Sequence, residues 1–355
     1  MSKVLIAMSG GVDSSLAAKK MIDMGYECIG CTMKLYHNED AGIDRRKTCC
    51  SLDDVEDARN VAYKLGMRYY VLNFTYDFHE KIIRKFVESY ENGITPNPCI
   101  DCNRFMKFDK LFERARVLGC DYIATGHYAR IEERDGKFLL KKALDDTKDQ
   151  SYVLYSMTQD QLAHTLFPLG DMCKTQVREL ARESAFVNAD KPDSQDICFV
   201  PDGDYVKVIE LHSDKKLQAG NFVDKKGKIL GKHRGIIHYT IGQRKGLGIS
   251  SSEPLYVCRI CRESGDIILG NKEDLMAKSC TVTDFNWISG IAPQEEFRCR
   301  AKIRYRQKEQ WATVTPIGEN NVQIVFDDPQ RAITPGQAAV LYDGDTVIGG
   351  GTIEK

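Results

Sequence analysis

The N-terminal pattern of strand, loop and helix constrains the fold of this chain more than any other feature. A continuous apolar run over 3–8 leads directly into the loop Ser9-Gly10-Gly11-Val12-Asp13-Ser14-Ser15, and an amphipathic stretch follows from about 13 to 24. This order predicts a buried β-strand, a tight turn and an α-helix. The two glycines let the backbone approach a pyrophosphate closely, and the free N–H groups of the helix start can donate to the anion.

The ending of this loop limits its chemistry. The loop lacks the Gly-Lys-Ser/Thr sequence of loops that transfer a γ-phosphate. We therefore expect it to hold the β,γ-pyrophosphate as a leaving group while the α-phosphorus is attacked, which is AMP transfer. The alternative is a strand-to-helix turn with a Ser/Asp cap and no ligand.

Strand and helix patterns alternate over the first two hundred residues. We expect strands at 3–8, 26–33, 68–74 and 121–125, and helices at 13–24, 53–65, 77–90 and 108–118. This alternation predicts a parallel sheet with helices on both faces and ligands at the carboxyl ends of its strands. After about Gly203, short strands separated by Gly-rich turns replace the helices. We expect an α/β N-terminal domain over 1–203, a small central β domain over 204–275 and a C-terminal β-barrel over 276–355.

Composition narrows the class of protein. Hydrophobic residues make up 42% and charged residues 28% of the chain, which excludes a largely disordered protein. No apolar run approaches the roughly 20 residues that span a bilayer, and the first strand is too short for a signal peptide. The net charge of −1 means that a nucleic acid would have to be held by local basic patches. The 13 cysteines, with no secretion signal, favour reduced thiols in the cytoplasm.

The phosphate loop carries a first family resemblance. The run from Ser9 to Ser14 resembles the loop of the PP-loop (N-type) ATP pyrophosphatases, which activate an oxygen by adenylation. This superfamily includes amidotransferase-type synthetases, lysidine synthetase and tRNA thiolases. The loop alone therefore leaves the substrate open.

Two cysteine-bearing stretches narrow the choice. Thr95-Pro96-Asn97-Pro98-Cys99-Ile100-Asp101-Cys102-Asn103 holds a Cys-x-x-Cys pair beside two prolines, and Asp193-Ser194-Gln195-Asp196-Ile197-Cys198-Phe199 holds a third thiol among polar residues. With these stretches the chain resembles the bacterial tRNA-specific 2-thiouridylase family over essentially its whole length. The motifs that carry the resemblance are Ala7–Ser14, Cys49-Cys50-Ser51, Asn97-Pro98, Cys102-Asn103, 124–129 (Ala-Thr-Gly-His-Tyr-Ala), 148–152 (Lys-Asp-Gln-Ser-Tyr), Ser194–Phe199 and 239–248 (Tyr-Thr-Ile-Gly-Gln-Arg-Lys-Gly-Leu-Gly).

The resemblance implies a role for each matching position. Cys102 matches the family's nucleophile and Cys198 the cysteine that carries persulfide sulfur, and the family joins the two as a transient disulfide. His127 follows a strand end, which places it near the nucleotide without a defined proton role. The implied ATP contacts are Ala7, Met8, Ser9, Gly10, Gly11, Val12, Asp13, Ser14, Met33 and Gly126. The implied tRNA contacts are Asn97, Pro98, Cys99, Lys148, Asp149, Gln150, Arg304 and Tyr305.

Cys99 departs from the family pattern. It stands where well-known members carry an aspartate proposed as general base, although Asp101 is close by. Cys99, Cys102 and Cys198 would make a three-thiolate set that suits a 4Fe-4S-type iron–sulfur cluster with one open iron, which could hold a hydrosulfide. Zinc and a spare thiol without metal are the alternatives. We expect a structural or neighbouring redox role for the pair Cys49-Cys50.

The segment 298–308 alternates basic and other side chains. At a period of two, the cations Arg298, Arg300, Lys302, Arg304, Arg306 and Lys308 would share one face of a strand. We expect this face to contact phosphates, and Tyr305 to stack on a base. The run Gln243-Arg244-Lys245 in a Gly-rich turn is a second expected phosphate contact.

The expected reaction has two stages on the wobble uridine of a tRNA anticodon stem-loop. ATP with Mg²⁺ adenylates the uridine C2 oxygen, with Asp13 near the metal, and sulfur from Cys198 or a cluster then replaces AMP. The sulfur comes from a donor protein or free sulfide, and we expect a monomer. One alternative is a PP-loop synthetase for a small molecule, which would not need the thiols. The other is a metal-stabilised RNA-binding protein without turnover.

Overall fold

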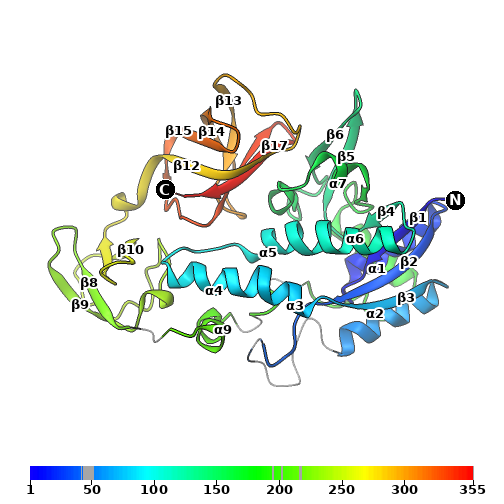
Figure 1. The fold of residues 1–355 in the computed structure, drawn as a ribbon, viewed down its shortest axis with the longest axis horizontal. Coiled ribbons are helices and arrows are strands. Elements are labelled where there is room, and N and C mark those ends of the chain that lie inside the picture. Colours follow the sequence, from blue (N-terminus) through cyan, green and yellow to red (C-terminus); the bar gives the residue numbers. More distant parts are fainter. Residues whose placement is uncertain (41, 43–51, 194–195, 201–202, 216–217, 355) are drawn as a thin grey trace.

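A five-stranded parallel sheet forms the N-terminal part of the computed structural model, which describes residues 1–354 except 41, 43–51, 194–195, 201–202 and 216–217 (Figure 1). The strand order is β3-β2-β1-β4-β7. Because β2 and β4 flank β1 on opposite sides, the loop after β1 lies at a switch point of the strand order, where such sheets bind ligands. The strands are β1 (Lys3–Ala7), β2 (Glu27–Lys34), β3 (Arg68–Asn73), β4 (Tyr122–Ala124) and β7 (Thr165–Leu166).

Helices cover both faces of this sheet, as predicted. Alternate residues of β1 point to opposite faces, so that Val4 and Ile6 join one apolar core and Leu5 joins another. The first core is completed by helices α1 (Val12–Asp23), α2 (Leu52–Lys64) and α8 (Lys174–Glu183). The second is completed by α3 (Thr75–Phe78), π-helix η1 (His79–Ile83) and α4 (Arg84–Glu91), which run on without a break, and by the helix described next.

The helix that we expected at 108–118 begins ten residues earlier. It consists of α5 (Pro98–Asp101), π-helix η2 (Cys102–Lys110) and α6 (Leu111–Val117). Asn97 caps it by accepting a hydrogen bond from the Cys99 N–H at 3.2 Å, and proline is favoured at the first helical position. The Asn-Pro pair was therefore a helix start signal, and both members of the Cys-x-x-Cys pair lie on the helix.

A β-hairpin interrupts the expected alternation of strands and helices. β5 (Ala129–Arg134) and β6 (Lys137–Lys142) pair antiparallel, and Lys141 of β6 pairs with Thr346 in the last strand of the chain. The N-terminal part therefore extends the C-terminal sheet by two strands (Figure 1). Helical segments η3 (Ser151–Leu154) and α7 (Gln159–Ala163) follow the hairpin.

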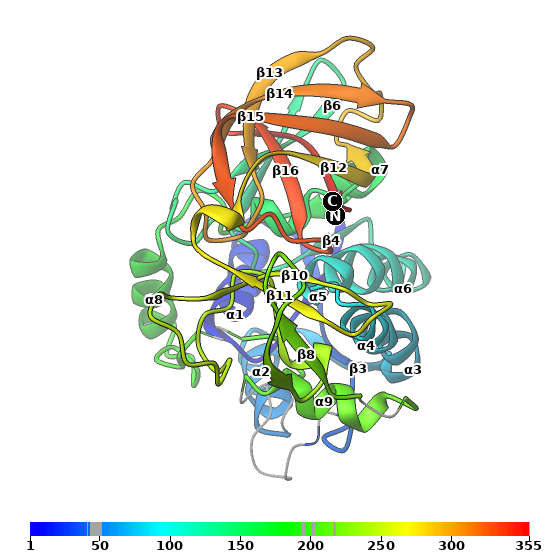
Figure 2. The ribbon, with the colours of Figure 1, turned by 90° about the vertical axis from the view of Figure 1, so that its left-hand side faces the viewer.

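The central part contains a four-stranded sheet of order β10-β11-β8-β9 beside helix α9 (Tyr205–His212) (Figure 2). Its own small core is built around Phe222, Val257 and Leu269. The strands are β8 (Gly220–Val223), β9 (Ile229–His233), β10 (Tyr256–Ile260) and β11 (Ile267–Gly270), with short 3-10 helices η4 (Ile236–His238) and η5 (Glu273–Leu275).

The C-terminal part is a closed antiparallel barrel of six strands, which confirms the predicted barrel. It closes because the long strand β12 pairs with β15 over one part of its length and with β17 over the other. In order around the barrel the strands are β12 (Met276–Trp287), β15 (Asn321–Arg331), β14 (Gln310–Ile317), β13 (Phe297–Lys302), β16 (Ala338–Asp343) and β17 (Thr346–Ile353).

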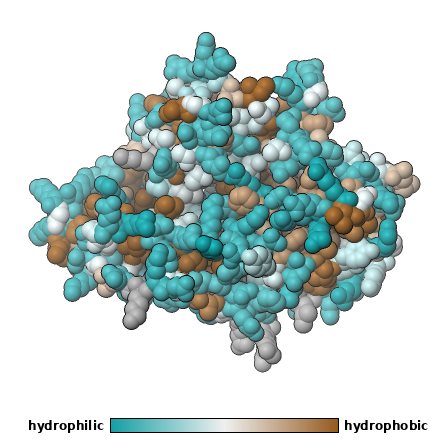
Figure 3. Space-filling model, viewed as in Figure 1, coloured by the Kyte–Doolittle hydropathy of each residue, from teal (hydrophilic) through white to brown (hydrophobic). Residues whose placement is uncertain are grey.

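The surface of the molecule has no large apolar band on the face shown in Figure 3, where hydrophobic side chains form small separate groups. Within the described ranges, no helix is both long enough and apolar enough to cross a membrane.

Candidate active site

The phosphate loop is held in shape by its own hydroxyl groups. Ser14 Oγ donates to the Gly11 carbonyl at 2.9 Å, and the Ser9 N–H donates to Ser14 Oγ at 3.2 Å. Gly10 has a φ of +80°, and a side chain there would clash with the Asp54 backbone, so that only glycine fits. The loop is therefore preformed for a ligand.

Gly126, which follows β4, lies directly against this loop. A Cβ atom at Gly126 would stand 2.8 Å from the Asp13 carbonyl carbon and from the Ser14 nitrogen. Behind the loop, Thr32 Oγ1 donates to the Met8 carbonyl at 2.6 Å, one residue before Met33 on β2. The structure thus brings together the segments from which we expected ATP contacts.

Asp13 lies at the centre of a network that the sequence did not reveal. Lys174, the first residue of α8, places its ammonium 2.6 Å from Asp13 Oδ1, and the Tyr128 hydroxyl donates to the same oxygen at 2.7 Å. Lys174 also pairs with Asp193 at 2.8 Å. Although partial burial acts to raise it, hydrogen bonds from Lys148 and Lys174 lower the pKa of Asp193 to about 2. Lys174 therefore brings to the site a cation that the loop itself lacks.

These acidic groups suit a metal ion that arrives with nucleotide. Mg²⁺ is usually held by one or two carboxylates together with substrate phosphates. Asp13 belongs to the loop, and Lys174 bridges it to Asp193. Both could therefore contribute an oxygen to Mg²⁺ once phosphates occupy the loop.

Cys102 is buried at the start of η2, and burial raises the pKa of its thiol to about 11. Cys99 lies one turn earlier on α5 and is exposed. Asp101, between them, is paired with Lys85 of α4 at 2.6 Å. The Asp101 carboxylate, which is close in sequence to Cys99, where the family pattern has an aspartate, is therefore already engaged in an ion pair.

The segment of Cys198 packs on the same helix. The Phe199 ring lies 5.2 Å from the ring of Phe86 on α4, and the Tyr36 hydroxyl donates to the Cys198 carbonyl at 2.6 Å. Cys102 and Cys198 both belong to the apolar core on this face of the sheet. The two thiol regions, a hundred residues apart in sequence, therefore lie on the same side of the molecule.

The structure does not show the expected three-thiolate metal site among the residues that it describes. In the part of the chain that the structure describes, no three His, Cys, Asp or Glu side chains gather closely enough to hold a metal ion. Cys99 is exposed and Cys102 is buried within the core, and the iron–sulfur cluster stays a prediction. The pair Cys49-Cys50 lies outside the described residues.

The C-terminal barrel positions the segment expected to meet the target base. The Thr95 N–H donates to the Pro335 carbonyl at 3.1 Å, and Gln337 Nε2 donates to the Thr95 carbonyl at 2.9 Å. These contacts fix the chain just before Asn97 and Pro98. Residues more than two hundred positions away therefore hold the segment that leads into α5.

The turn 148–150 contacts both the N-terminal part and the segment that follows β13 of the barrel. Lys148 pairs with Asp193 at 2.8 Å, and Gln150 Oε1 accepts a hydrogen bond from the Tyr128 N–H at 2.9 Å. Tyr305 donates to the Asp149 carbonyl at 3.2 Å. The expected tRNA contacts at 148–150 and at Tyr305 therefore lie side by side.

The expected row of six cations is wrong. β13 ends at Lys302, and 303–307 form bends and turns, so that Arg304, Arg306 and Lys308 do not continue its face. Arg304 turns inward and donates to Thr334 Oγ1 at 2.6 Å and to the Ala332 carbonyl at 3.0 Å. Burial lowers its pKa, and the side chain is a structural link rather than an open cation.

Three family models match successive parts of the chain. The model described as tRNA methyl transferase HUP domain matches residues 2–202, tRNA methyl transferase PRC-barrel domain matches 207–271, and Aminomethyltransferase beta-barrel domain matches 277–353. The tRNA-specific 2-thiouridylase MnmA of Clostridioides difficile (strain 630) is 53% identical over 99% of this chain and 98% of its own length. The protein of that name from Acetivibrio thermocellus is 52% identical over 99% of both chains. This chain belongs to the tRNA-specific 2-thiouridylase family.

The outer face of β13 carries aromatic partners that sequence reasoning missed. Arg300 lies 5.2 Å from the ring centre of Trp311, which is opposite it on β14 and half exposed. Lys302 lies 5.6 Å from the Tyr152 ring and 5.7 Å from the Tyr305 ring. Trp311 belongs to no motif, and only the pairing of β13 with β14 reveals its place.

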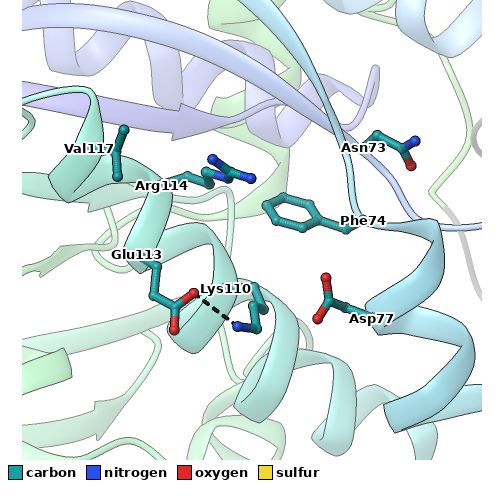
Figure 4. Close-up of a pocket in the computed structure, with 7 residues that line it drawn as sticks. All are labelled: Asn73, Phe74, Asp77, Lys110, Glu113, Arg114 and Val117. Carbon is teal, nitrogen blue, oxygen red and sulfur yellow. Dashed lines mark hydrogen bonds and ion pairs between the residues drawn. The ribbon is translucent and has the colours of Figure 1, made fainter.

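Two cavities of the structure lie away from the loop and the thiols. One of about 300 Å³ opens between the end of β3 and α6, where Arg114 reaches toward Phe74 and Lys110 pairs with Glu113 (Figure 4). Asn73, Asp77 and Val117 complete its lining. The other, of about 500 Å³, lies between α9 and the central part and includes Arg234, Gln243 and Arg304. Gln243, one of the expected phosphate contacts, therefore faces a basic hollow.

Proposed function

We propose that this protein is an ATP-dependent tRNA-uridine 2-sulfurtransferase that thiolates C2 of the anticodon wobble uridine. The observation that supports the proposal is that a phosphate loop and two thiol regions are built on the same sheet. A preformed phosphate loop lies at the switch point of the sheet, and both thiol regions pack on α4 above the same sheet. Two relatives that are about half identical to this chain over its whole length are named tRNA-specific 2-thiouridylase.

The first stage activates the base. The uridine C2 oxygen attacks the α-phosphorus of ATP, the bond between the α-phosphorus and the bridging oxygen breaks, and pyrophosphate leaves with the electron pair. Adenylation turns a poor leaving group into a good one. In this proposal the loop from Ala7 to Ser14, with Met33 and Gly126, holds ATP, and Lys174 neutralises charge on the departing pyrophosphate. Asp13 and Asp193 face the accompanying Mg²⁺.

The second stage transfers sulfur. The terminal sulfur of a Cys198 persulfide attacks C2, and AMP leaves. The Cys102 thiolate then attacks the Cys198 sulfur, which releases the thiolated base and leaves a Cys102–Cys198 disulfide for an external reductant. Both segments rest on α4, which supports this pairing. Because the thiols do not gather as a metal site among the residues described, no step is routed through an iron–sulfur cluster.

The tRNA surface of this proposal differs from the one expected from sequence. Asn97, Pro98 and Cys99 remain at the site of the flipped base, with 148–150 beside them. Arg300, Lys302 and Tyr305 contact the anticodon loop, whereas Arg304 supports the junction from within. All these elements come from one chain, and we propose that a monomer acts, in the cytoplasm, with a donor protein that transfers persulfide sulfur to Cys198. Free sulfide is already fully reduced, so it could serve only by attacking the adenylated C2 directly, without the Cys198 persulfide.

A tRNA thiolation assay tests this function. The purified full chain is incubated with tRNA, ATP, Mg²⁺ and a persulfide donor, and thiolated tRNA and released pyrophosphate are measured. Cys198→Ser should abolish thiolation while tRNA-dependent pyrophosphate release continues, and Cys261→Ser in the central part should change neither. Pyrophosphate release that ignores tRNA but responds to a small acid would contradict the proposal. If anaerobically purified protein thiolates tRNA only when iron is bound, the persulfide route would be wrong, but the proposed function would stand.

A further inference from the structure

We propose that Lys107 is the cation that stabilises the α-phosphoryl group during adenylation, and that His127 orients it as a neutral hydrogen-bond acceptor. This inference rests on the proposed function and assigns charge stabilisation for its first stage. It concerns two residues for which neither the motifs nor the family resemblance gave a chemical role.

The π-helix places Lys107 on the face of Cys102. In an α-helix, a residue five positions on is rotated by about 140° from the first. A π-helix closes hydrogen bonds between residues five apart, which brings such residues nearly above one another. Cys102 and Lys107 are five apart within η2. The irregular helix therefore turns the lysine toward the thiol side of the site.

The Lys107 ammonium has no acidic partner among the residues described. Its contact there is His127 Nε2, at 3.4 Å from Lys107 Nζ. Its helix neighbour Lys110 pairs with Glu113 at 3.0 Å, and Lys85 pairs with Asp101 at 2.6 Å. A partly buried cation without a counter-charge is costly unless an anionic ligand completes the site. Lys107 is therefore positioned to receive an anion.

The contacts of His127 fix its tautomer. A lysine ammonium only donates, so Nε2 of the ring must accept from Lys107. The ring proton then resides on Nδ1 and is donated to Thr125 Oγ1 at 2.7 Å. Burial, reinforced by the Lys107 charge, holds the pKa of His127 well below its usual range. The histidine is therefore neutral and has no proton for a leaving group, so its task is to hold the lysine.

Lys107 and His127 lie between the phosphate loop and the thiols. His127 follows Gly126, which touches the loop backbone at Asp13 and Ser14. On the other side, the Lys107 charge acts to lower the pKa of Cys102 and of Cys99, so its ammonium lies near both thiols. When ATP occupies the loop and the target uridine lies beside Cys99, the α-phosphorus would lie between the loop and the thiols, next to Lys107.

The chemistry needs a cation at this point. The bond from the uridine C2 oxygen to phosphorus forms as the bond to pyrophosphate breaks, and negative charge builds on the non-bridging α-oxygens. The N3 proton of the uridine leaves to water. Lys107 donates to the charged oxygens, and a fixed donor of this kind typically contributes 10²–10³-fold in rate.

The test isolates adenylation in the Cys198→Ser full chain, where sulfur transfer is blocked. Single-turnover pyrophosphate release is measured with saturating ATP and tRNA. Lys107→Met should lower the rate constant by about 10²–10³-fold, with ATP and tRNA dissociation constants within about threefold. Lys107→Arg should restore part of the rate. Lys110→Met, on the same helix but paired with Glu113, should be unaffected.

The histidine is tested separately. His127→Gln keeps an acceptor for Lys107 and should retain most of the rate, whereas His127→Phe should lose as much as Lys107→Met. The rate in the parent protein should not change between pH 6 and 8, since a neutral histidine does not titrate there. Thermal unfolding of each variant checks that it folds.

Two results would overturn the inference. The first is that Lys107→Met releases pyrophosphate at the parent rate in the Cys198→Ser chain, yet fails in sulfur transfer in the chain that keeps Cys198. This result would assign the lysine to the thiols instead. A break in the pH profile that His127→Gln removes would make His127 an acid–base group. Absence of tRNA-dependent pyrophosphate release from the parent protein would instead contradict the proposed function.

Discussion

The ring of Phe86 packs edge-on against the ring of Phe199, with 5.2 Å between the ring centres. The residue before Phe86 on α4, Lys85, pairs with Asp101 at 2.6 Å. Two consecutive residues of one helix therefore hold the segments that carry Cys198 and Cys102. A disulfide between these cysteines needs Cα atoms within about 7 Å, and a shared support on α4 limits how far the segments must move.

Removal of the Lys174 ammonium should weaken nucleotide binding. Lys174→Met leaves Asp13 and Asp193 without their shared counter-charge beside the phosphate loop. We expect ATP affinity to fall by about tenfold or more, since charge-assisted contacts of this kind are worth about 1.5–3 kcal/mol. Isothermal titration calorimetry measures this. Lys19→Met, which removes an exposed pair with Asp23 on α1, is the matched control and should bind ATP normally.

The arginines at 300 and 304 should respond differently to alanine. Arg300 is exposed on β13 and, within the described part of the chain, has no acidic partner, whereas Arg304 donates to the barrel at Thr334 and Ala332. Arg300→Ala should weaken tRNA binding and reduce the slope of log affinity against log salt by about one. Arg304→Ala should instead lower the melting temperature. An unchanged salt slope for Arg300→Ala would exclude it as a phosphate contact.

Trp311 should contribute to tRNA binding through stacking. Its ring is half exposed and lies beside Arg300, in an arrangement that suits an unstacked base. Trp311→Ala should cost about 1–3 kcal/mol in tRNA affinity with the salt slope retained. Ile317→Ala, an exposed apolar residue further along β14, should bind tRNA like the parent protein. Equal affinity of both variants would argue against a stacking role.

The buried Cys102 thiol should make stability fall in alkali. Burial raises its pKa from 9.0 to about 11, so between these values the unfolded chain loses a proton that the folded chain keeps. Stability is therefore full below pH 9 and declines as the pH rises toward 11. Urea unfolding at several pH values should show a shallower decline for Cys102→Ala than for the parent protein. Alkylation of Cys102 should also be slow at pH 7 and accelerate above pH 9.

Local patterns in the sequence were sufficient for much of the architecture. The loop from Ser9 to Ser14, the parallel sheet and the closed barrel were predicted because periodicity and turn residues reflect the burial of each segment along the chain. The roles expected for Cys102 and Cys198 came instead from the family resemblance, which their distinctive neighbouring residues carry.

The tertiary structure decided where the strands end and which charged residues, distant in sequence, meet. The alternation of basic residues continues to Lys308, but β13 stops at Lys302, and the Arg304 guanidinium turns inward to acceptors in the barrel. Lys174 meets Asp13 across 161 positions of sequence. A single sequence specifies local backbone preference and burial directly, whereas ion pairs depend on how the sheet, helices and barrel pack. The motifs therefore named the loop and the thiols, and the fold supplied the cations that serve them.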